Sequence, residues 1–288
     1  MDINNNQKSV LICGATSFVA QGFSDLLKKK GFKIDTFSRG KNGNINGCYT
    51  EIDKNEGLSE HYDVVVNFAV LKDTPVENNI KYVKALTKMC IEKGVRKLIH
   101  FSSIMVYGYK DMIVLEETPI EKSSETYKKG YAEIKIAVDE YLRSLKESLP
   151  FELVLVRPGY VLADNRPCPF IKRLPLGICI IKGNKNSKQP IVKREEIHLA
   201  LLKIIETEQN NDVYHFFPNN GMTKYKYAQE TVGGVIFTMP KWLFKSIPLL
   251  MCKIGVMPKA LYSRFEGMYI ESEFSSRLTE EKLNFKFS

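Results

Sequence analysis

Short apolar runs alternate with helix-like segments through the first half of the chain, and this alternation constrains the fold more than any other feature. The runs SVLIC at 9–13, YDVVVNFAV at 62–70 and FELVLVRPG at 151–159 are apolar on both faces. Such strands are typical of parallel sheets, because crossover helices cover both faces of a parallel sheet. Crossovers are right-handed, so the sequence predicts an α/β fold with a doubly wound, Rossmann-type parallel sheet.

Composition narrows the class of protein. The chain has 288 residues, of which 44% are hydrophobic and 26% charged, and these values describe a globular chain rather than a disordered one. All uncharged runs, including Thr231–Pro240, are shorter than the roughly 20 residues of a membrane span, so we expect no transmembrane segment. The N-terminus shows no signal-peptide pattern, and the six cysteines lack CxxC spacing. We therefore expect a cytoplasmic protein with reduced thiols and no metal site.

A predicted phosphate-binding turn joins the first strand to the first helix. Gly14, Ser17 and Ala20 follow the strand at a spacing of three, where glycines normally let the backbone approach a pyrophosphate. Ser17 stands at the middle position, and its hydroxyl can itself donate to phosphate. The alternative is a plain strand-to-helix turn. We assign the following turn residues to a dinucleotide cofactor: Gly14, Thr16, Ser17, Phe18 and Val19.

The end of the second predicted strand distinguishes between the two nicotinamide cofactors. The segment FSRGK at 37–41 holds two cations and no acid. An acid at this place binds the ribose hydroxyls of NAD, whereas an arginine accommodates the 2′-phosphate of NADP. We therefore predict NADP(H), with NAD(H) as the alternative, and assign Ser38, Arg39 and Lys41 to it. The two cations could instead be solvated loop residues.

Three polar residues form a predicted catalytic set. Ser103 ends the apolar run RKLIHFSS, and Tyr131 and Lys135 lie four residues apart on one face of a helix predicted at 131–147. All three follow strands of a parallel sheet, where ligands bind in such folds. A nearby ammonium and an oxidised nicotinamide lower the pKa of a tyrosine toward working pH, so that it can exchange a proton. Without Ser103, such a Tyr–Lys pair would be common on a surface helix.

The motifs GATSFVA, DVVVNFAV, FSSIMVYG, YAEIK and VRPG resemble those of the extended short-chain dehydrogenase/reductases, in the NAD-dependent epimerase/dehydratase family that modifies nucleotide sugars. The resemblance implies a catalytic triad of Ser103, Tyr131 and Lys135, in which the lysine also binds the nicotinamide ribose. It implies a homodimer formed by the helices predicted at 76–93 and 131–147. We also assign Phe68, Ala69 and Pro158 to the cofactor.

The alternation of strands and helices continues and then becomes less regular. Further strands are predicted at 32–38, 96–103 and 212–217, and further helices at 23–30 and 195–207. After Gly159 the prolines become frequent and the pattern weakens. We predict an NADP-binding Rossmann domain of residues 1–165 plus about 190–217. Residues 166–189 plus 218–288 form a predicted substrate-binding subdomain.

The stretch 166–194 is strongly basic. It holds eight basic residues and no acidic one, namely Arg166, Lys172, Arg173, Lys182, Lys185, Lys188, Lys193 and Arg194. It is either a solvated loop face or a funnel for a phosphate-bearing ligand. We assign Arg173 and Arg194 to the diphosphate of a nucleotide-sugar substrate. The remaining predicted substrate contacts are Ser103, Ile104, Met105 and Tyr160. Since the chain lacks zinc-finger spacing and RNP-like motifs, we expect no nucleic-acid partner.

The residues after the catalytic serine indicate the reaction. Ile104 and Met105 stand where 4,6-dehydratases of the resembled family carry an Asp–Glu pair, and neither can transfer a proton. The cysteine of the GDP-fucose type of 3,5-epimerase/reductase is also missing near Ser103. We predict an NADPH-dependent 4-ketoreductase of a nucleoside-diphosphate 4-keto-6-deoxy sugar, in polysaccharide biosynthesis, with hydride delivered to C4 and Tyr131 as proton donor. The alternatives are an NAD-dependent nucleotide-sugar 4-epimerase, an NADPH-dependent reductase of a non-nucleotide ketone, and a non-catalytic NADP-sensing binder.

The segment 232–264 is both apolar and basic. It could lie on a membrane surface. We favour the other interpretation, in which its apolar residues pack in the core of the second subdomain.

Overall fold

The computed structural model describes residues 7–40, 43–108, 112–120, 130–162, 168, 170–208, 212–232, 234–238, 241–256 and 273–288, with no side chains described for 241–245. The chain divides into two compact units. The first unit comprises Met1–Val106, Gly130–Pro158 and Glu195–Tyr214. The second unit comprises Tyr107–Lys129, Gly159–Arg194 and His215–Ser288.

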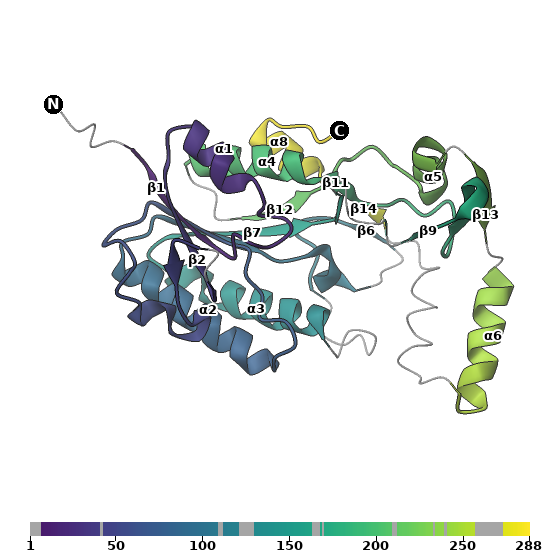
Figure 1. Ribbon diagram of the computed structural model, residues 1–288, viewed down its shortest axis with the longest axis horizontal. Helices are drawn as coiled ribbons and strands as arrows, with labels where there is room; N and C mark the ends of the chain where they lie inside the picture. The colour runs from purple at the N-terminus through teal and green to yellow at the C-terminus, as the bar shows by residue number, and fades with distance from the viewer. Residues whose placement is uncertain are drawn as a thin grey trace. The chain divides into compact units, whose positions relative to one another are not determined.

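A seven-stranded sheet with the order β12-β7-β5-β4-β1-β2-β3 organises the first unit (Figure 1). Its strands are β1 (Ser9–Cys13), β2 (Lys33–Ser38), β3 (Ile45–Asn46), β4 (Val64–Asn67), β5 (Lys97–Phe101), β7 (Glu152–Pro158) and β12 (Val213–Phe216). The pairings of β1 with β2 and β4, of β2 with β3, and of β5 with β4 and β7 are all parallel. Strand order reverses beside β1, as it does at the ligand-binding edge of doubly wound folds. The predicted fold class is therefore confirmed.

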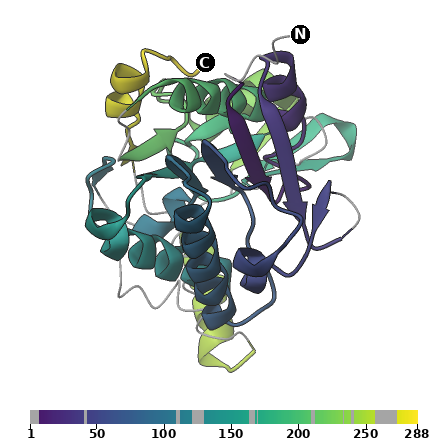
Figure 2. The ribbon, with the colours of Figure 1, turned by 90° about the vertical axis from the view of Figure 1, so that its left-hand side faces the viewer.

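Helices cover both faces of this sheet. On one face lie α1 (Phe23–Lys29) and α4 (Arg194–Glu206), and on the other lie α2 (Val76–Glu92) and α3 (Tyr131–Leu145) (Figure 1). Figure 2 shows α2 and α3 side by side beneath the strands. The short 3-10 helix η1 (Tyr49–Lys54) packs along α2. Two-sided coverage explains why β1, β4 and β5 are apolar on both faces.

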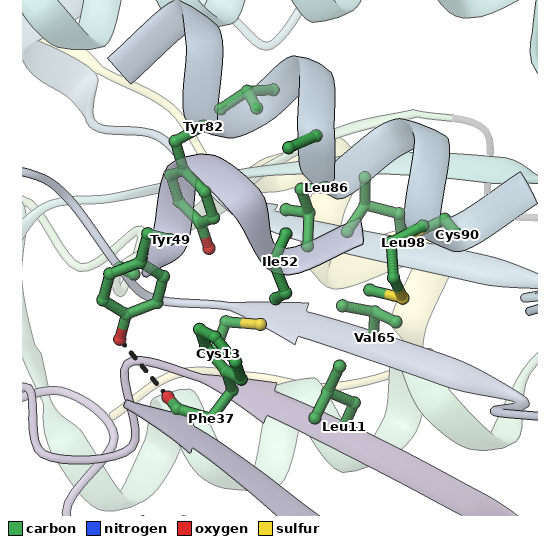
Figure 3. Packing of buried hydrophobic residues seen from close by; sticks show 14 of the residues in the cluster. Leu11, Cys13, Phe37, Tyr49, Ile52, Val65, Tyr82, Leu86, Cys90 and Leu98 are labelled. Carbon is green, nitrogen blue, oxygen red and sulfur yellow. Dashed lines mark hydrogen bonds between the residues drawn. The ribbon is translucent and has the colours of Figure 1, made fainter. Parts of the chain in front are cut away.

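The main core of the first unit lies between α2 and the sheet (Figure 3). Tyr82, Leu86 and Cys90 project from one side of α2, and they meet Leu11 and Val65 from the central strands. Burying each large apolar side chain of this kind contributes about 1.5–3 kcal/mol. The core therefore holds the strand ends, and the loops that follow them, in fixed places.

Small sheets make up the second unit. Three strands pair in the order β13-β10-β9, and two further sheets pair β11 with β8 and β14 with β6. The strands are β6 (Ile113–Val114), β8 (Tyr160–Leu162), β9 (Ile171–Leu174), β10 (Ile178–Ile181), β11 (Ile191–Lys193), β13 (Val235–Thr238) and β14 (Glu273–Phe274). The helices are α5 (Lys224–Val232), α6 (Lys241–Lys253) and α8 (Arg277–Leu283). Strands of two to four residues carry too little periodicity to be recognised in the sequence.

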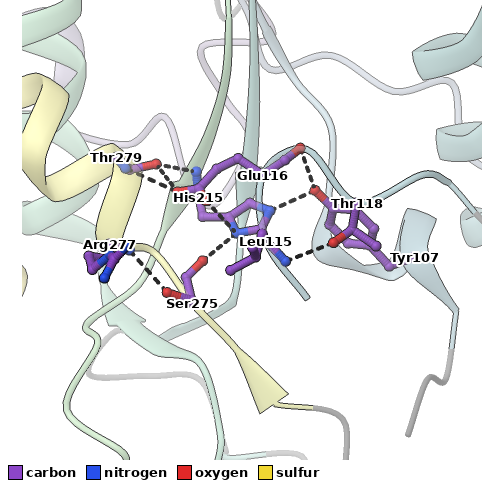
Figure 4. Close-up of polar contacts among 8 residues, drawn as sticks. All are labelled: Tyr107, Leu115, Glu116, Thr118, His215, Ser275, Arg277 and Thr279. Atoms are coloured by element: carbon purple, nitrogen blue, oxygen red, sulfur yellow. Dashed lines mark hydrogen bonds and ion pairs between the residues drawn. The ribbon is translucent and has the colours of Figure 1, made fainter. Parts of the chain in front are cut away.

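A buried polar cluster anchors the C-terminal helix of the second unit (Figure 4). Glu116 Oε1 accepts hydrogen bonds from Thr279 N at 3.0 Å and from Thr279 Oγ1 at 2.8 Å. His215 Nδ1 lies 2.7 Å from the Ser275 carbonyl, and its Nε2 lies 2.7 Å from the Tyr107 hydroxyl. Burial raises the pKa of the Glu116 carboxyl. These side-chain hydrogen bonds therefore join α8 and the segment before it to Glu116 and His215.

The described part of the segment 232–264 differs from our expectation, and residues 257–264 lie outside the described residues. Val235 and Phe237 on β13 are 59% and 54% exposed, and Leu250 on α6 is 60% exposed. The interpretation of these side chains as core is therefore wrong, although Val232 and Ile236 do pack against the core of the second unit. Among the described residues, no helix has the length and apolar character required to cross a membrane.

Candidate functional site

Tyr131 and Lys135 lie near the carboxyl end of β5, the strand that Ser103 follows in the chain. Helix α3 begins at Tyr131, and Lys135 follows one turn later with its Nζ 5.7 Å from the centre of the Tyr131 ring. The same Nζ donates a hydrogen bond to the carbonyl of Phe101, the last residue of β5. Ser103 comes two residues after Phe101. The helical spacing and this one hydrogen bond therefore bring Tyr131 and Lys135 to the strand end that carries Ser103.

Lys135 is buried, whereas Tyr131 is open to solvent. Lys135 is 2% exposed and Tyr131 is 42% exposed. Burial lowers the pKa of the Lys135 ammonium to about 7, against an opposing effect of the Asp139 carboxylate. A lysine in this state can change its protonation near neutral pH, which suits a group that supports proton transfer by a neighbouring phenol.

Two adjacent serines follow β5, and their surroundings differ. Ser102 Oγ donates to Asp139 Oδ2 at 2.5 Å, so this hydroxyl is committed to a buried carboxylate. Ser103 Oγ accepts a hydrogen bond from the backbone N–H of Met105 at 3.2 Å. Among the described residues, nothing accepts the proton of the Ser103 hydroxyl, which leaves it able to donate to a substrate oxygen.

A buried ion pair of Asp139 and Arg157 adjoins Ser102, and our sequence reasoning missed it. Arg157 donates from Nε and Nη2 to the two oxygens of Asp139, at 3.0 and 2.6 Å. Both side chains are fully buried, so the pair is a bidentate contact shielded from water. Two signals could have shown it: Asp139 lies one turn after Lys135 on the predicted helix, and Arg157 belongs to the VRPG motif.

A second buried network holds the loop that follows β4. Asn67 Oδ1 accepts from the Tyr82 hydroxyl at 2.7 Å and from the backbone N–H of Ala69 at 3.0 Å. Asn67 Nδ2 lies 3.0 Å from His100 Nδ1. Burial, with the nearby Lys135 charge, lowers the pKa of His100 well below its usual value, so the ring is neutral. The network fixes the backbone at Phe68 and Ala69, two predicted cofactor contacts.

The turn after β1 approaches that loop closely. Gly14 has φ +78°, and a Cβ at this position would lie 2.7 Å from the backbone nitrogen of Ala69. Only glycine allows both the backbone conformation and the approach. The hydroxyl of Ser17 is buried and has no hydrogen-bond partner among the described residues. The close approach at Gly14 and the buried hydroxyl of Ser17 both fit a site for the phosphates of a dinucleotide.

The other turn residues differ in exposure. Thr16 is exposed, whereas Phe18 and Val19 are half-buried. The Val19 carbonyl lies 2.7 Å from His198 Nε2 of α4. Successive backbone hydrogen bonds fold residues 14–22 into turns, so α1 begins only at Phe23.

The end of β2 presents one described cation. Arg39 is exposed, with its guanidinium carbon 6.0 Å from the centre of the Tyr49 ring. Ser38 is buried and donates from Oγ to the Gly40 carbonyl at 2.6 Å. Lys41, the second predicted cation, lies outside the described residues. The exposed Arg39 is therefore the residue available to a 2′-phosphate at this end.

Asp35, the acid of β2, is engaged elsewhere. Its Oδ2 accepts from the Tyr62 hydroxyl and from Ser59 Oγ, both at 2.8 Å. It also lies three residues before the end of the strand. Asp35 therefore does not take the role of the ribose-binding acid of NAD enzymes.

The remaining predicted residues of the first unit lie near strand ends. Pro158 is the buried last residue of β7. Ile104 and Met105 lie in the short helix η2 (Ile104–Tyr107), 7% and 40% exposed. Met105 can therefore contact a ligand, whereas Ile104 mainly packs inside.

Tyr160, Arg173 and Arg194 belong to the second unit. Tyr160 on β8 is 43% exposed, and Arg194 is the first residue of α4. Arg173 on β9 donates from Nη2 to the Thr231 carbonyl at 3.2 Å. It pairs with Cys179, whereas its neighbour Lys172 pairs with Ile180, so the two cations lie on opposite faces of their sheet.

Comparisons with known proteins agree with this geometry. A family model described as "NAD dependent epimerase/dehydratase family" matches residues 10–199. No curated protein matches the sequence. The resemblance noted from the motifs is confirmed, as is the expectation of an oxidoreductase-type enzyme with a nicotinamide cofactor at the level of this family.

Solved structures share the fold at low sequence identity. The human epimerase family protein SDR39U1, solved with NADPH, has a TM-score of 0.70 and 17% identity, covering 97% of this chain and 95% of its own. The dTDP-glucose 4,6-dehydratase of Bacillus anthracis str. Ames, solved with NAD, has a TM-score of 0.67 and 14% identity over 98% and 92% of the two chains. The UDP-N-acetylglucosamine 4-epimerase of Bacillus cereus has a TM-score of 0.67 and 12% identity over 98% and 94%. These likenesses establish the fold.

Proposed function

The chain belongs to the NAD dependent epimerase/dehydratase family, and from that premise we propose that it is an NADPH-dependent 4-ketoreductase of a nucleoside-diphosphate 4-keto-6-deoxy sugar. The observation that carries the proposal is the buried Lys135 Nζ, which contacts both the Tyr131 ring and the carboxyl end of β5 beside Ser103. This arrangement supplies a hydroxyl to hold a ketone oxygen and a phenol to protonate it.

The chain's own residues account for the proton side of the reaction. NADPH, when bound, supplies the hydride that reduces the sugar C4. Ser103 donates a hydrogen bond to the C4 ketone oxygen, and Tyr131 transfers its phenolic proton to that oxygen as the alcohol forms. The Lys135 ammonium beside the ring stabilises the resulting phenolate. The buried Asp139 lies one turn beyond Lys135 and favours its charged form.

The cofactor is held by residues of the first unit in this proposal. Gly14, Ser17 and Ala69 surround the pyrophosphate, and Arg39 binds the 2′-phosphate that distinguishes NADP from NAD. Support for NADP(H) comes from the exposed Arg39 and from the engagement of Asp35 in other hydrogen bonds. Lys135 also binds the nicotinamide ribose, with Phe68 and Pro158 as neighbours.

Residues after Ser103 support reduction over dehydration. Elimination of water needs an acid and a base beside the sugar, and Ile104 and Met105 supply neither. A reductase must release its oxidised cofactor after each turnover, whereas an epimerase of this family retains it. A 4-epimerase therefore remains the second candidate, and cofactor retention distinguishes the two.

One assay tests the reaction. The purified protein is analysed for bound nicotinamide and then given NADPH with a panel of 4-keto-6-deoxy sugar nucleotides, while the absorbance of reduced nicotinamide is followed. We expect stoichiometric loss of NADPH with one member of the panel. Tightly held NAD without net oxidation would contradict the proposal and indicate an epimerase. Turnover only with a ketone that lacks a nucleotide would contradict the substrate class.

Arg173 and Arg194 of the second unit bind the substrate diphosphate in this proposal. Arg173→Ala should raise KM for the sugar nucleotide much more than KM for NADPH, because arginine forms paired hydrogen bonds with phosphate oxygens. Lys172→Ala is the matched control, since Lys172 is adjacent in the chain but lies on the opposite sheet face. Equal effects of Arg173→Ala on both KM values would refute the assignment.

We also propose that residues 1–165 plus about 190–217 bind the cofactor, and that 166–189 plus 218–288 bind the nucleotide sugar. A homodimer through α2 and α3 remains our prediction, and light scattering of the purified protein tests it. The free thiols of Cys13, Cys90 and Cys179 are buried, which supports a reducing, cytoplasmic location.

A further inference from the structure

The three-stranded sheet of the second unit has one face in the core and one face outside it. Register pairs Ile178 with Val235 and Ile180 with Phe237, so these four side chains share a face. The opposite face carries Cys179, Ile181 and Ile236, and these side chains pack in the core of the second unit. The outer face therefore presents apolar side chains on an edge strand, β13, where soluble proteins normally place charged residues.

The turn between β9 and β10 adds a fully exposed leucine. Leu176 is 95% exposed and has φ +64°, a backbone conformation that is unfavourable for a leucine. The turn lies against β13, because a Cβ on Gly234 would lie 1.8 Å from the Gly177 carbonyl oxygen. Leu176 is thus a bulky apolar residue held in a strained conformation at the tip of a turn. Folding alone does not require such a residue there.

Helix α6 exposes further apolar side chains. It begins three residues after β13 ends, and it exposes Ile247 and Leu250, with Ile254 following at its end. Their exposed fractions are 48%, 60% and 64%, and spacings of three and four place them on one side of the helix. The backbone N–H of Val256 bonds to the Met251 carbonyl at 2.9 Å and fixes the helix end.

The described segments that carry these side chains are basic. Residues 170–181 hold Lys172 and Arg173 and no acidic residue. Residues 234–238 and 241–256 together hold three lysines and no acidic residue. On the outer sheet face, Lys172 pairs with Ile180 and is exposed. Apolar side chains rimmed by lysine, without acids, match the chemistry of an anionic lipid surface.

We propose that the second unit docks on anionic membranes through this surface, which we call the docking face and which consists of Leu176, Val235, Phe237, Ile247, Leu250 and Ile254, with Lys172 and Lys253. The apolar side chains enter the headgroup region while the lysines meet the lipid phosphates. A second copy of the chain is a poorer occupant, because self-association would bring two surfaces of the same positive charge together. The docking is independent of the reaction proposed above.

Vesicle flotation of the full-length protein tests the proposal. Phosphatidylcholine vesicles with phosphatidylserine should carry the protein upward, pure phosphatidylcholine vesicles should carry much less, and added salt should release it. Leu176→Asp and Leu250→Asp should each lower binding about tenfold or more, since each removes an apolar anchor and adds a charge that anionic lipid repels. Leu199→Asp is the matched control, because Leu199 on α4 is 46% exposed but lies in the first unit.

A second pair of variants tests the electrostatic part. Lys172→Glu should reduce flotation roughly 30-fold, because it removes one attraction to anionic lipid and adds one repulsion, whereas Lys203→Glu on α4 of the first unit should leave flotation unchanged. Circular dichroism and NADPH binding establish that every variant is folded. Absence of flotation by the parent protein would overturn the proposal, as would unchanged flotation of both leucine variants. Dimerisation that Leu250→Asp abolishes, without any vesicle binding, would assign the face to a second copy and also overturn it.

Discussion

Two ion pairs, one in each unit of the chain, differ in their exposure to water. In the first unit, an ion pair between Asp139 and Arg157 is buried, with side-chain exposures of 0% and 1%. In the second unit, the ion pair between Lys188 and Glu273 is exposed, at 47% and 42%, while leucine and phenylalanine side chains face solvent. The pair of the first unit is therefore shielded from water and the pair of the second unit is solvated, although the second unit also buries the polar side chains of Glu116 and His215.

This difference indicates a division of work. Buried charges in a large core keep their geometry, which suits the proposed proton transfer from Tyr131 to the substrate with Lys135 beside it. The second unit has a small core around Cys179 and Ala228, and it depends on polar anchoring by Glu116 and Thr279. Its surface carries the residues that we assign to the substrate diphosphate and to the membrane.

The largest effect should come from the phenol of the first unit. Tyr131→Phe should lower kcat of NADPH-dependent ketone reduction by roughly 10²–10⁴-fold, because it removes the proton donor. NADPH binding, measured by fluorescence titration, should persist. Tyr141→Phe, on the same helix but without a proposed role, should retain activity. Equal activity of the two variants would contradict the role of Tyr131 and would favour a cofactor-sensing protein.

Breaking the buried ion pair should lower the free energy of unfolding much more than breaking the exposed one. Asp139→Asn should lower the free energy of unfolding by about 3–5 kcal/mol, because it leaves the buried Arg157 without its counter-charge. Glu273→Gln should cost about 0–1 kcal/mol, because the pair with Lys188 is solvated. Urea unfolding of both variants measures the difference. Similar losses would show that burial of the ion pairs does not distinguish the units.

The stability of the folded chain should increase with pH because of Lys135. Its pKa is about 7 in the folded chain, against an ordinary value of 10.5. Between these values the unfolded chain binds a proton that the folded chain lacks, so the free energy of unfolding increases with pH, by up to about 1.4 kcal/mol per unit. Urea unfolding from pH 7 to pH 10 should show a steeper rise for the parent than for Lys135→Met. Parallel curves would contradict the lowered pKa.

Glu116 in the second unit should act in the opposite direction. Its folded pKa lies above the ordinary 4.5, so its contribution to stability is present at low pH and is lost as pH rises through the folded pKa. Glu116→Gln keeps an oxygen that can accept from Thr279 and should flatten this loss. Unfolding of the parent and the variant between pH 4 and pH 8 measures it, and identical slopes would refute it.

The smallest effect should come from the strained turn of the docking face. Leu176→Gly should raise the free energy of unfolding by roughly 1 kcal/mol, because glycine tolerates φ +64°. Leu174→Gly in the same hairpin should lower it, since Leu174 has φ −114° and gains nothing from glycine. Thermal melts of the two variants should therefore move in opposite directions. A shared decrease would show that Leu176 is not strained.

Local patterns predict the first unit well. The helices expected at 76–93 and 131–147 are α2 and α3, within two residues at each end. Long apolar runs and regular helices carry strong periodicity, and Tyr131 and Lys135 are joined by helical spacing alone. The contact of Lys135 with β5, by contrast, depends on a pairing of distant segments and could not be deduced from spacing.

The second unit was predicted only in outline. Its strands are short, and β13 pairs with β10 across more than 50 residues of sequence, which no local signal records. We expected the segment 232–264 to be core because it is apolar, yet Phe237 and Leu250 are exposed. Hydrophobicity predicts that a side chain avoids water, but which surface covers it depends on the fold.

The sequence by itself determined the doubly wound sheet, the glycine at the first turn and the helix that carries Tyr131 and Lys135, because each follows from periodicity or from local backbone sterics. Tertiary structure alone decided three other things: the commitment of Ser102 to Asp139, the burial that lowers the pKa of Lys135, and the face that β13 leaves outside the core. These properties depend on which distant groups meet and how much water they exclude, and both are set only when the chain has folded.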